Sequence, residues 1–453
     1  MPSSMNTPLS RSALLLASVF VSACASYQPL PLREGRPADL VVDTRSLPFA
    51  PMAAHRFDPD DGLDIVAVAI LAVVNNPDLR LVRDDASIAH AQSFSAGLLP
   101  DPQLALSGDL SNSVGAGGNK AFSFGLSYDI SSLLTHGALH GAAERDAVKT
   151  DLTLLWQEWQ VASQAQLLFI RVMQGRQQMA VLTETRQLFA DRYARTRQAL
   201  DKGLLNNDAV APNLAALQDV DRQLFDQSKL ENQAAHDLNA LLGLAPDAVL
   251  MLRDDGDVAA IDASLAASAL DQIVRRRPDL RALQAAYEAQ DQRYRGALLA
   301  QFPALSLGFT RARDSSNVYS SGVGINMSLP FLNRNRGNIA IEQATRQKAY
   351  DEFQVRVQAA RNDVRRILDE QALNQAQDDK LDADLRELSA VLARGDHAFR
   401  AGNADALAYA AARSALLSRQ LERIALRQAV LEQRVALRTL LGVDMTTLES
   451  VNP

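Results

Sequence analysis

The amino-acid sequence is internally duplicated: four short landmarks of its first half return in the same order in its second half, each about 200 residues later. An Asn/Arg-Pro-Asp-Leu-Arg segment occurs at 76–80 and 277–281, and a proline before a leucine-rich strand occurs at Pro100 and Pro303. A lone glycine occurs at Gly203 and Gly402, and a Leu-Leu-Gly segment at 241–243 and 440–442. A repeat of this kind means that one structural unit occurs twice. The landmarks predict a first repeat at residues 61–245, a linker at 246–265, a second repeat at 266–445 and a tail at 446–453.

Each repeat is predicted to be mainly helical. A helix of roughly forty residues should end at Pro100 or Pro303, because proline cannot continue a helix. After two strands comes an unusually long helical stretch, about residues 138–201 and again 335–400, without any proline. At 1.5 Å per residue, roughly 65 residues make a rod of about 100 Å. The apolar residues of these rods fall close to heptad spacing, which is typical of coiled coils. Each rod should turn back at 202–206 or 401–405 into an antiparallel return helix.

The second strand of each repeat alternates between apolar and polar residues. The apolar sets are Phe122, Phe124, Leu126 and Tyr128 in the first repeat, and Val323, Ile325, Met327 and Leu329 in the second. Period-two alternation gives a strand one apolar and one polar face. Four short strands cannot close a barrel, and an open sheet in a membrane would leave backbone groups unpaired. We therefore expect several protomers to pool their strands, with apolar faces toward lipid and small polar faces toward a lumen.

The N-terminus is predicted to be a targeting segment. Residues 1–23 contain one charge, Arg11, and their apolar run is too short to span a membrane, which is typical of a signal peptide. The run ends at Val21-Ser22-Ala23-Cys24, which resembles a bacterial lipobox. The resemblance implies cleavage before Cys24, a covalent diacylglyceryl and palmitate lipid on that residue, and a lipid-anchored segment at residues 24–60. Cys24 is the only cysteine, so the chain can form no internal disulfide.

The order of helices and strands, the lipobox, and the segments 276–280 (Arg-Arg-Pro-Asp-Leu) and 329–339 together resemble the TolC family of outer-membrane efflux proteins, over about residues 60–445. The resemblance implies a homotrimer with a shared transmembrane β-barrel and a periplasmic α-helical tunnel. It also implies a passive exit duct in the bacterial outer membrane, lipid-anchored and extending into the periplasm. A periplasmic adaptor protein and an inner-membrane pump would be its partners. Residues 96–102 and 333–339 are most similar to the heavy-metal efflux branch of this family.

The helix turns carry the candidate site residues. In the family the tunnel closes near these turns, often at acidic residues shortly after a glycine, which makes Asp208 and Asp405 the candidate periplasmic gate. Three carboxylates, one from each protomer, would form a ring that attracts cations. The same two residues also suit the N-terminus of a helix, where a carboxylate caps or is solvated, and this alternative stays open. The candidate adaptor contacts are Lys202, Gly203, Asn206, Gly402 and Asn403.

Other chemistry is not predicted. No nucleophile–base arrangement or phosphate-binding loop is visible, so the chain is expected not to be an enzyme. His136 and His140 have the i, i+4 spacing of a metal pair but lack a third ligand nearby in sequence, so neither a metal site nor a cofactor is expected apart from the lipid on Cys24. With a net charge of −7 and interspersed acids and bases, no nucleic-acid partner is expected. The alternative function is a periplasmic coiled-coil structural lipoprotein without a pore, which would have no use for amphipathic hairpins.

Overall fold

The computed structural model describes residues 27–32, 62–109, 120–253, 258–400 and 406–443, with the side chains of 396–400 and 406–407 excepted. The chain forms two compact units, Met1–Pro37 and Ala38–Pro453. In the first unit, the described residues 27–32 are exposed and have neither helix nor strand. Every element below belongs to the second unit. The predicted signal peptide and four of the candidate site residues, Cys24, Gly402, Asn403 and Asp405, lie outside the described residues.

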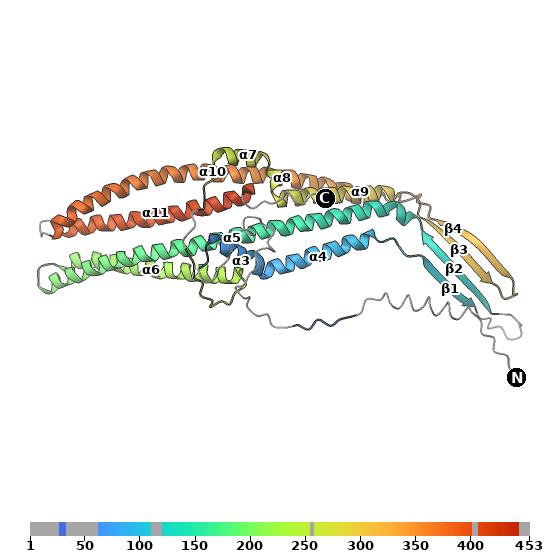
Figure 1. The fold of residues 1–453 in the computed structure, drawn as a ribbon, viewed down its shortest axis with the longest axis horizontal. Coiled ribbons are helices and arrows are strands. Elements are labelled where there is room, and N and C mark those ends of the chain that lie inside the picture. Colours follow the sequence, from blue (N-terminus) through green and yellow to red (C-terminus); the bar gives the residue numbers. More distant parts are fainter. Residues whose placement is uncertain (1–26, 33–61, 110–119, 254–257, 401–405, 444–453) are drawn as a thin grey trace, which may run out of the picture. The chain divides into compact units, whose positions relative to one another are not determined.

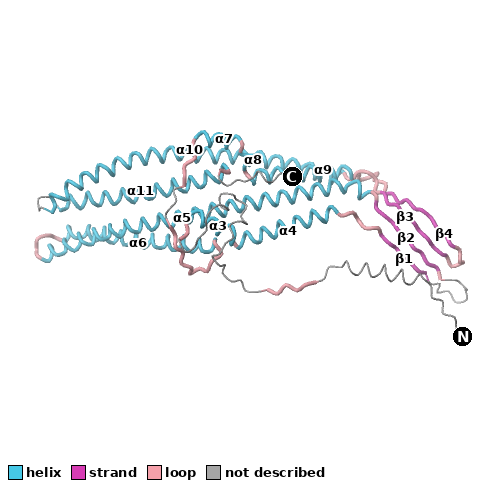
Figure 2. The backbone as a smooth tube through the Cα atoms, viewed as in Figure 1, coloured by secondary structure: helices cyan, strands magenta, loops and turns pink. Residues whose placement is uncertain are grey.

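The second unit runs twice through the same order of elements: helices, two strands, a long helix and a return helix (Figures 1 and 2). In the first half the elements are α3 (Ile65–Asn75), α4 (Pro77–Gly97), β1 (Gln103–Asp109), β2 (Ala121–Asp129), α5 (Ser131–Asp201) and α6 (Asn207–Leu241). In the second half they are α7 (Ala263–Asp271), α8 (Ile273–Arg276), α9 (Pro278–Leu299), β3 (Leu305–Arg313), β4 (Tyr319–Met327), α10 (Arg336–Arg400) and α11 (Ala406–Leu441). The predicted fold class, mainly helical with a small antiparallel sheet, is confirmed.

The prediction of one forty-residue helix before each strand pair is wrong, because each of these helices is broken at a proline. Asn76 has ψ 124°, an extended value, and Pro77 starts α4 as its first residue. Proline disfavours the helical conformation in the residue before it and has no N–H to donate, so it suits a helix start. The Asn76 side chain then accepts a hydrogen bond from Leu79 N at 2.9 Å. Arg277 and Pro278 make the corresponding break before α9, with ψ 120° at Arg277.

The long helices are continuous where their partners are broken. The 71 residues of α5 correspond to a rod of about 106 Å, and the 65 residues of α10 to about 98 Å. Along its length α5 packs against α4, α3 and α6, and on another side against α9 and α11, whereas α10 packs against α9 and α11. The helix α5 begins at Ser131, not near residue 138 as predicted. Its first turns run beside α4, and His136 there lies 3.2 Å from the Gly97 carbonyl oxygen.

The main hydrophobic core lies at the helix breaks. Helix α3 is apolar all round and is buried from Ala67 to Val73, which is the pattern of a helix enclosed by other elements. Its core cluster includes Phe169 of α5, Leu238 of α6 and Val435 of α11, so α3 joins both halves. Of the described helices, none is by itself long and apolar enough to cross a membrane, although α3 and α4, which meet at 49°, pass that test of length and composition as a pair.

The two glycines of the repeated Leu-Leu-Gly landmark end the return helices at these breaks. Gly243 and Gly442 have φ values of +66° and +64°, which L side chains rarely adopt. A Cβ on Gly243 would lie 2.7 Å from the Asn75 carbonyl oxygen, and one on Gly442 would lie 3.2 Å from the Trp159 ring. A Cβ on Gly442 would also lie 3.4 Å from the Arg276 side chain, so in each half the return helix ends beside the break of that half.

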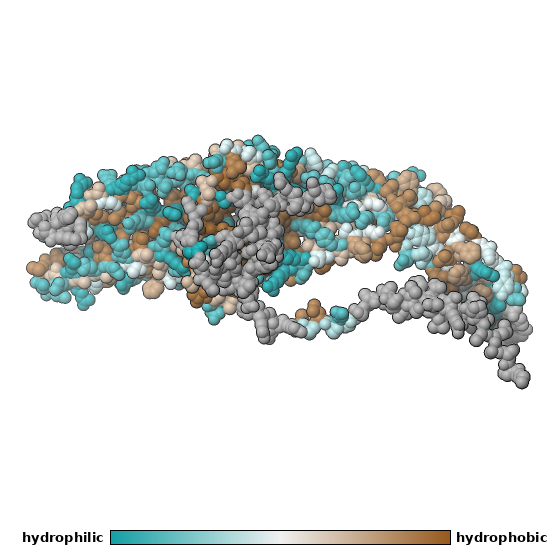
Figure 3. All heavy atoms as spheres, viewed as in Figure 1, coloured by the Kyte–Doolittle hydropathy of each residue, from teal (hydrophilic) through white to brown (hydrophobic). Residues whose placement is uncertain are grey.

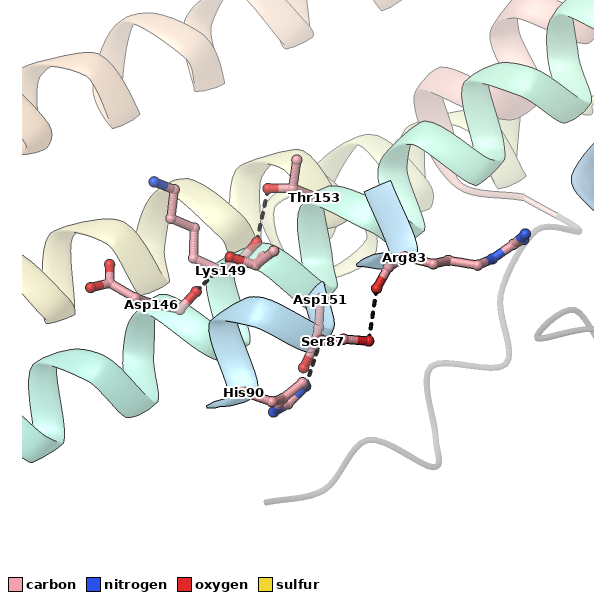
Figure 4. Close-up of polar contacts among 8 residues, drawn as sticks. Arg83, Ser87, His90, Asp146, Lys149, Asp151 and Thr153 are labelled. Carbon is pink, nitrogen blue, oxygen red and sulfur yellow. Dashed lines mark hydrogen bonds and ion pairs between the residues drawn. The ribbon is translucent and has the colours of Figure 1, made fainter. Parts of the chain in front are cut away.

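Polar contacts tie the helices together along their length. Figure 4 shows His90 of α4 beside Asp151 of α5, with the ring Nε2 3.0 Å from the carboxylate oxygen. Between the two halves, Arg171 of α5 lies 3.0 Å from Glu432 of α11. Such exposed ion pairs contribute little to stability, so the register of the helices rests mainly on the apolar core.

Candidate functional site in the sheet and the helix turn

Within the described residues, the four strands form one antiparallel sheet in the order β1-β2-β3-β4. Neighbouring strands pair in register, so that Leu104, Leu126, Phe309 and Val323 form one row across the sheet. Residues opposite one another in a register lie on the same face. The sheet therefore has one apolar face, which we call the apolar face, and one face of small and polar residues, which we call the small face.

The apolar face is exposed. Its large residues, each between 37% and 74% accessible, are Leu104, Leu106, Phe122, Phe124, Leu126, Leu307, Phe309, Tyr319, Val323, Ile325 and Met327. The small face carries Ala105, Ser107, Ser123, Gly125, Ser127, Gly308, Thr310, Gly322 and Gly324. Water-soluble sheets bury the apolar side and expose the polar one. An exposed apolar patch of this size marks an interaction surface.

The strand length fits a bilayer. Strands β2, β3 and β4 have nine residues each, or about 30 Å of extended chain. Tilted by about 40°, such strands span roughly 23 Å, close to the roughly 25 Å apolar band of outer-membrane barrels. Further exposed apolar residues, Leu98, Leu99, Phe302, Leu329, Phe331 and Leu332, lie in the segments that join the strands to the helices. Figure 3 shows hydrophobic residues gathered where the helices give way to the strands.

Both edges of the sheet are open. In the part of the chain that the structure describes, β1 and β4 each have a neighbouring strand on one side only. Unpaired edge N–H and C=O groups pair readily with another chain, and they cannot stay unpaired in hydrocarbon. Among the described residues, the sheet therefore has one edge at β1 and another at β4 that could pair with a further strand.

At the opposite end of the long helices lies the turn between α5 and α6 (Figure 1). Gly203 has φ +72°, and Leu204 N bonds to Ala199 O while Gly203 N bonds to Leu200 O. This pair of bonds is a Schellman motif, which requires a left-handed residue and so explains the glycine. The side chains of Lys202, Leu204 and Asn206 are exposed. The turn thus presents a defined, accessible surface at the tip of the hairpin.

Asp208 is exposed in the first turn of α6. Its Oδ2 lies 3.4 Å from the Asn206 side-chain amide nitrogen, and its carboxylate suits the positive end of the helix dipole. This position at the start of α6 suits a capping role for Asp208, and the exposed carboxylate is also open to a gate ring formed by several protomers. Of the candidates in the two turns, the structure describes Lys202, Gly203, Asn206 and Asp208 and brings them to one tip.

The two histidines do not form a metal centre in the described residues. His136 and His140 both lie in α5 with ring centroids 6.0 Å apart. His136 contacts the Gly97 carbonyl oxygen, and His140 pairs with Glu144 at 3.2 Å. Nowhere in the described ranges do three His, Cys, Asp or Glu side chains group closely enough to hold a metal ion.

Sequence reasoning missed two groups of residues. The first is Arg277, which is 1% exposed, bonds through two nitrogens to the Asp279 carboxylate at 2.9 and 2.7 Å, and stacks on Trp156 at 4.8 Å. The second is the pair Arg311 and Arg313, which lie on the apolar face of β3. The sequence did offer a signal for this pair, because Arg311 and Arg313 have odd numbers, as do Leu307 and Phe309, and alternate residues of a strand lie on the same face.

Comparison with known proteins agrees with this geometry. Residues 269–443 match the family model described as Outer membrane efflux protein. No curated protein matches the chain by sequence. Among solved structures, the chain resembles CusC at 20% identity, with 91% of this chain and 99% of that chain covered and a TM-score of 0.69. It also resembles the Campylobacter jejuni CmeC outer membrane channel (16% identity, 92% and 95% covered, TM-score 0.70) and the open state of the Neisseria gonorrhoeae MtrE outer membrane channel (17%, 93% and 98%, TM-score 0.69).

The architecture, long helical hairpins with a four-stranded sheet at one end, is therefore that of outer-membrane channels. The family model matches residues 269–443, most of the second half, and that part of the chain is similar to outer membrane efflux proteins.

Proposed function

We propose that this protein is the exit duct of a tripartite efflux pump in the outer membrane, built from three copies of the chain. The observation that carries the proposal is the sheet: its apolar face is exposed, its small face is polar, and both of its edges are open. A coiled-coil tether without a pore has no use for such a sheet.

Three protomers would contribute twelve strands, with β1 of one protomer paired to β4 of the next. That pairing satisfies every edge, and twelve strands leave a wider interior than the eight that side chains alone can fill. The apolar face would contact lipid, and the small face, with its glycines, serines and Thr310, would line a water-filled lumen.

The helices would continue the lumen into the periplasm. Helices α5 and α10 are each about 100 Å long, and in the proposed trimer they and their return helices assemble into a tunnel. The duct is passive in this proposal: an inner-membrane pump supplies the energy, and a periplasmic adaptor connects the two. A lipid on Cys24 would anchor each protomer to the outer membrane.

The tips of the hairpins are the proposed point of docking and closure. Lys202, Gly203 and Asn206 lie together at the described tip, and Gly402 and Asn403 take the same place in the second repeat by sequence. Asp208, together with Asp405 of the second repeat, is the proposed gate. Replacing both aspartates by Ala should lower the cation preference of the channel, and an unchanged preference would leave these residues with a capping role only.

The first experiment is the mass of the detergent-solubilised, acylated protein, corrected for bound detergent. The expected result is three protomers, with stepwise conductance when the sample is added to a planar lipid bilayer. A monomer with its lipid intact would refute the shared barrel and favour the tether. A Cys24→Ala variant is the control for the anchor, since it should still form trimers once inserted. The similarity to the heavy-metal branch stays a prediction, which export assays with metal cations and with dyes would test.

A further inference from the structure

The charges on the strands are distributed unevenly between the two faces of the sheet. Four charged residues lie within the strands, and the two acids, Asp109 and Asp129, pair with small-face residues. Arg311 and Arg313 instead lie on the apolar face, opposite Phe124 and Phe122. A charge that faces lipid is destabilising at the bilayer midplane and tolerated near the interface. Two arginines on this face therefore need a physical reason.

Their position along the strand supplies the first part of that reason. From the helix end toward the tip, the apolar face of β3 reads Leu305, Leu307, Phe309, Arg311 and Arg313. Along β3 the residues on this face change from apolar to cationic between Phe309 and Arg311. Their partners in β4 change from Val323 to Ser321 between the same two rows. The two arginines thus occupy the last two rows, at the end of the sheet away from the helices.

The surroundings of Arg313 are those of a membrane interface. Its guanidinium lies 5.2 Å from the centre of the Phe122 ring and 6.0 Å from that of Tyr319, and these two rings meet edge to face at 6.4 Å. Aromatic residues gather at the boundary between hydrocarbon and headgroups. The two rings fix the direction of the guanidinium.

The donors of both arginines are largely unused. Arg313 donates from Nη2 to the Lys120 carbonyl oxygen at 2.7 Å, and its Nε has no hydrogen-bond partner although it is buried. Neither arginine forms an ion pair with any carboxylate in the described part of the chain. The nearby Asp314 is occupied by its own turn, where its Oδ1 accepts from Ser316 N and Val318 N, each at 2.9 Å.

We propose that Arg311 and Arg313 form a binding site for the phosphate of an anionic lipid headgroup, in the leaflet away from the helices. This inference rests on the proposed function, since it requires the apolar face to be in lipid. Two residues apart on one face, the side chains start about 6.8 Å from each other, so both can reach one phosphate. Arginine binds phosphate with two parallel hydrogen bonds. In the proposed trimer, protomers join at strand edges, so this face stays open to lipid.

Native mass spectrometry of the full-length trimer in detergent tests the site. The probes are phosphatidylglycerol, diacylglycerol with the same acyl chains, and water-soluble glycerol phosphate. The wild type should retain phosphatidylglycerol in preference to diacylglycerol, and glycerol phosphate should not compete at the same concentration. An interfacial arginine contributes about fivefold to the binding of an anionic lipid, so R311Q/R313Q should weaken phosphatidylglycerol binding about 25-fold and leave diacylglycerol binding unchanged.

Two further variants separate charge from packing. R311K/R313K keeps both charges and should retain most of the binding. R195Q/R197Q removes two exposed arginines with the same spacing from α5, far from the sheet, and should bind lipid as the wild type does.

Three outcomes would overturn the site: equal retention of both lipids by the wild type, undiminished binding by R311Q/R313Q, or effective competition by glycerol phosphate. The same spectra report the oligomeric state. A trimer without lipid preference removes only the headgroup site, whereas a monomer removes the proposed function and the site with it.

Discussion

The orientation of the sheet can be tested with a pair of arginine substitutions on the two opposite faces of β3. Leu307 lies on the apolar face, four residues from Arg311, or about 13 Å along the strand. With Arg311 at the interface, and with the apolar band continuing into the exposed residues between strands and helices, a strand tilt of about 40° places Leu307 at a depth of roughly 10 Å, close to the midplane of a band about 25 Å thick. An arginine at that depth on the lipid side costs about 2–4 kcal/mol. Leu307→Arg should therefore lower the free energy of unfolding by about this amount per protomer.

Thr310→Arg is the matched control, because Thr310 lies on the small face of the same strand and is exposed. An arginine there would lie in the water-filled lumen, and we expect its effect to stay within about 0.5 kcal/mol. The measurement is urea-dependent unfolding of each variant from phosphatidylcholine vesicles, with the trimer band on a gel as a second readout. If Thr310→Arg is the more damaging change, the two faces have been assigned the wrong way round. If both changes are neutral, the sheet does not lie in the bilayer.

Three further predictions concern the helical part of the protein. Gly203 and Gly243 both need a positive φ, so Gly203→Ala, in open space, should cost about 1–2 kcal/mol of stability. Gly243→Ala should cost at least 1 kcal/mol more, since its Cβ would lie 2.7 Å from a carbonyl oxygen. Equal shifts in the thermal unfolding midpoint of the two variants would contradict this. Arg277→Met should destabilise by about 3 kcal/mol in chemical denaturation, because Asp279 loses its bidentate partner, and Arg277→Lys should rescue little of it, since lysine lacks the planar fork. Burial raises the pKa of Glu158 above its ordinary value of 4.5, although an arginine pairs with it. In this pH range the folded state binds more protons than the unfolded state, so stability should fall as pH rises from about 4.5 through the raised pKa. Glu158→Gln should remove that part of the pH dependence of the thermal midpoint; the same pH dependence in the variant would refute the prediction.

Local sequence patterns determined much of this protein. The alternation in β2 and β4 predicted which side chains share a face, because side chains alternate along any strand whatever lies next to it. The absence of proline over some 65 residues predicted the continuous helices α5 and α10, and the repeated landmarks predicted that the order of elements would recur. The Gly203 turn was also visible, since a glycine that interrupts a helical pattern is the usual way to end a helix.

The tertiary structure decided what depends on neighbours distant in sequence. The pattern before Pro100 reads as one helix, and only the packing of α3 inside a core drawn from α5, α6 and α11 shows that the chain breaks at Pro77 and bends by 49°. Arg277 reads as one arginine among several, yet its guanidinium is buried because Trp156 and Asp279 converge on it. Likewise the pairing of β3 with β2 brings Arg313 against Phe122, 191 residues earlier in the chain. Periodicity fixes the face on which a side chain lies, but the groups it meets there are fixed by strand register and helix packing, which bring together residues distant in sequence.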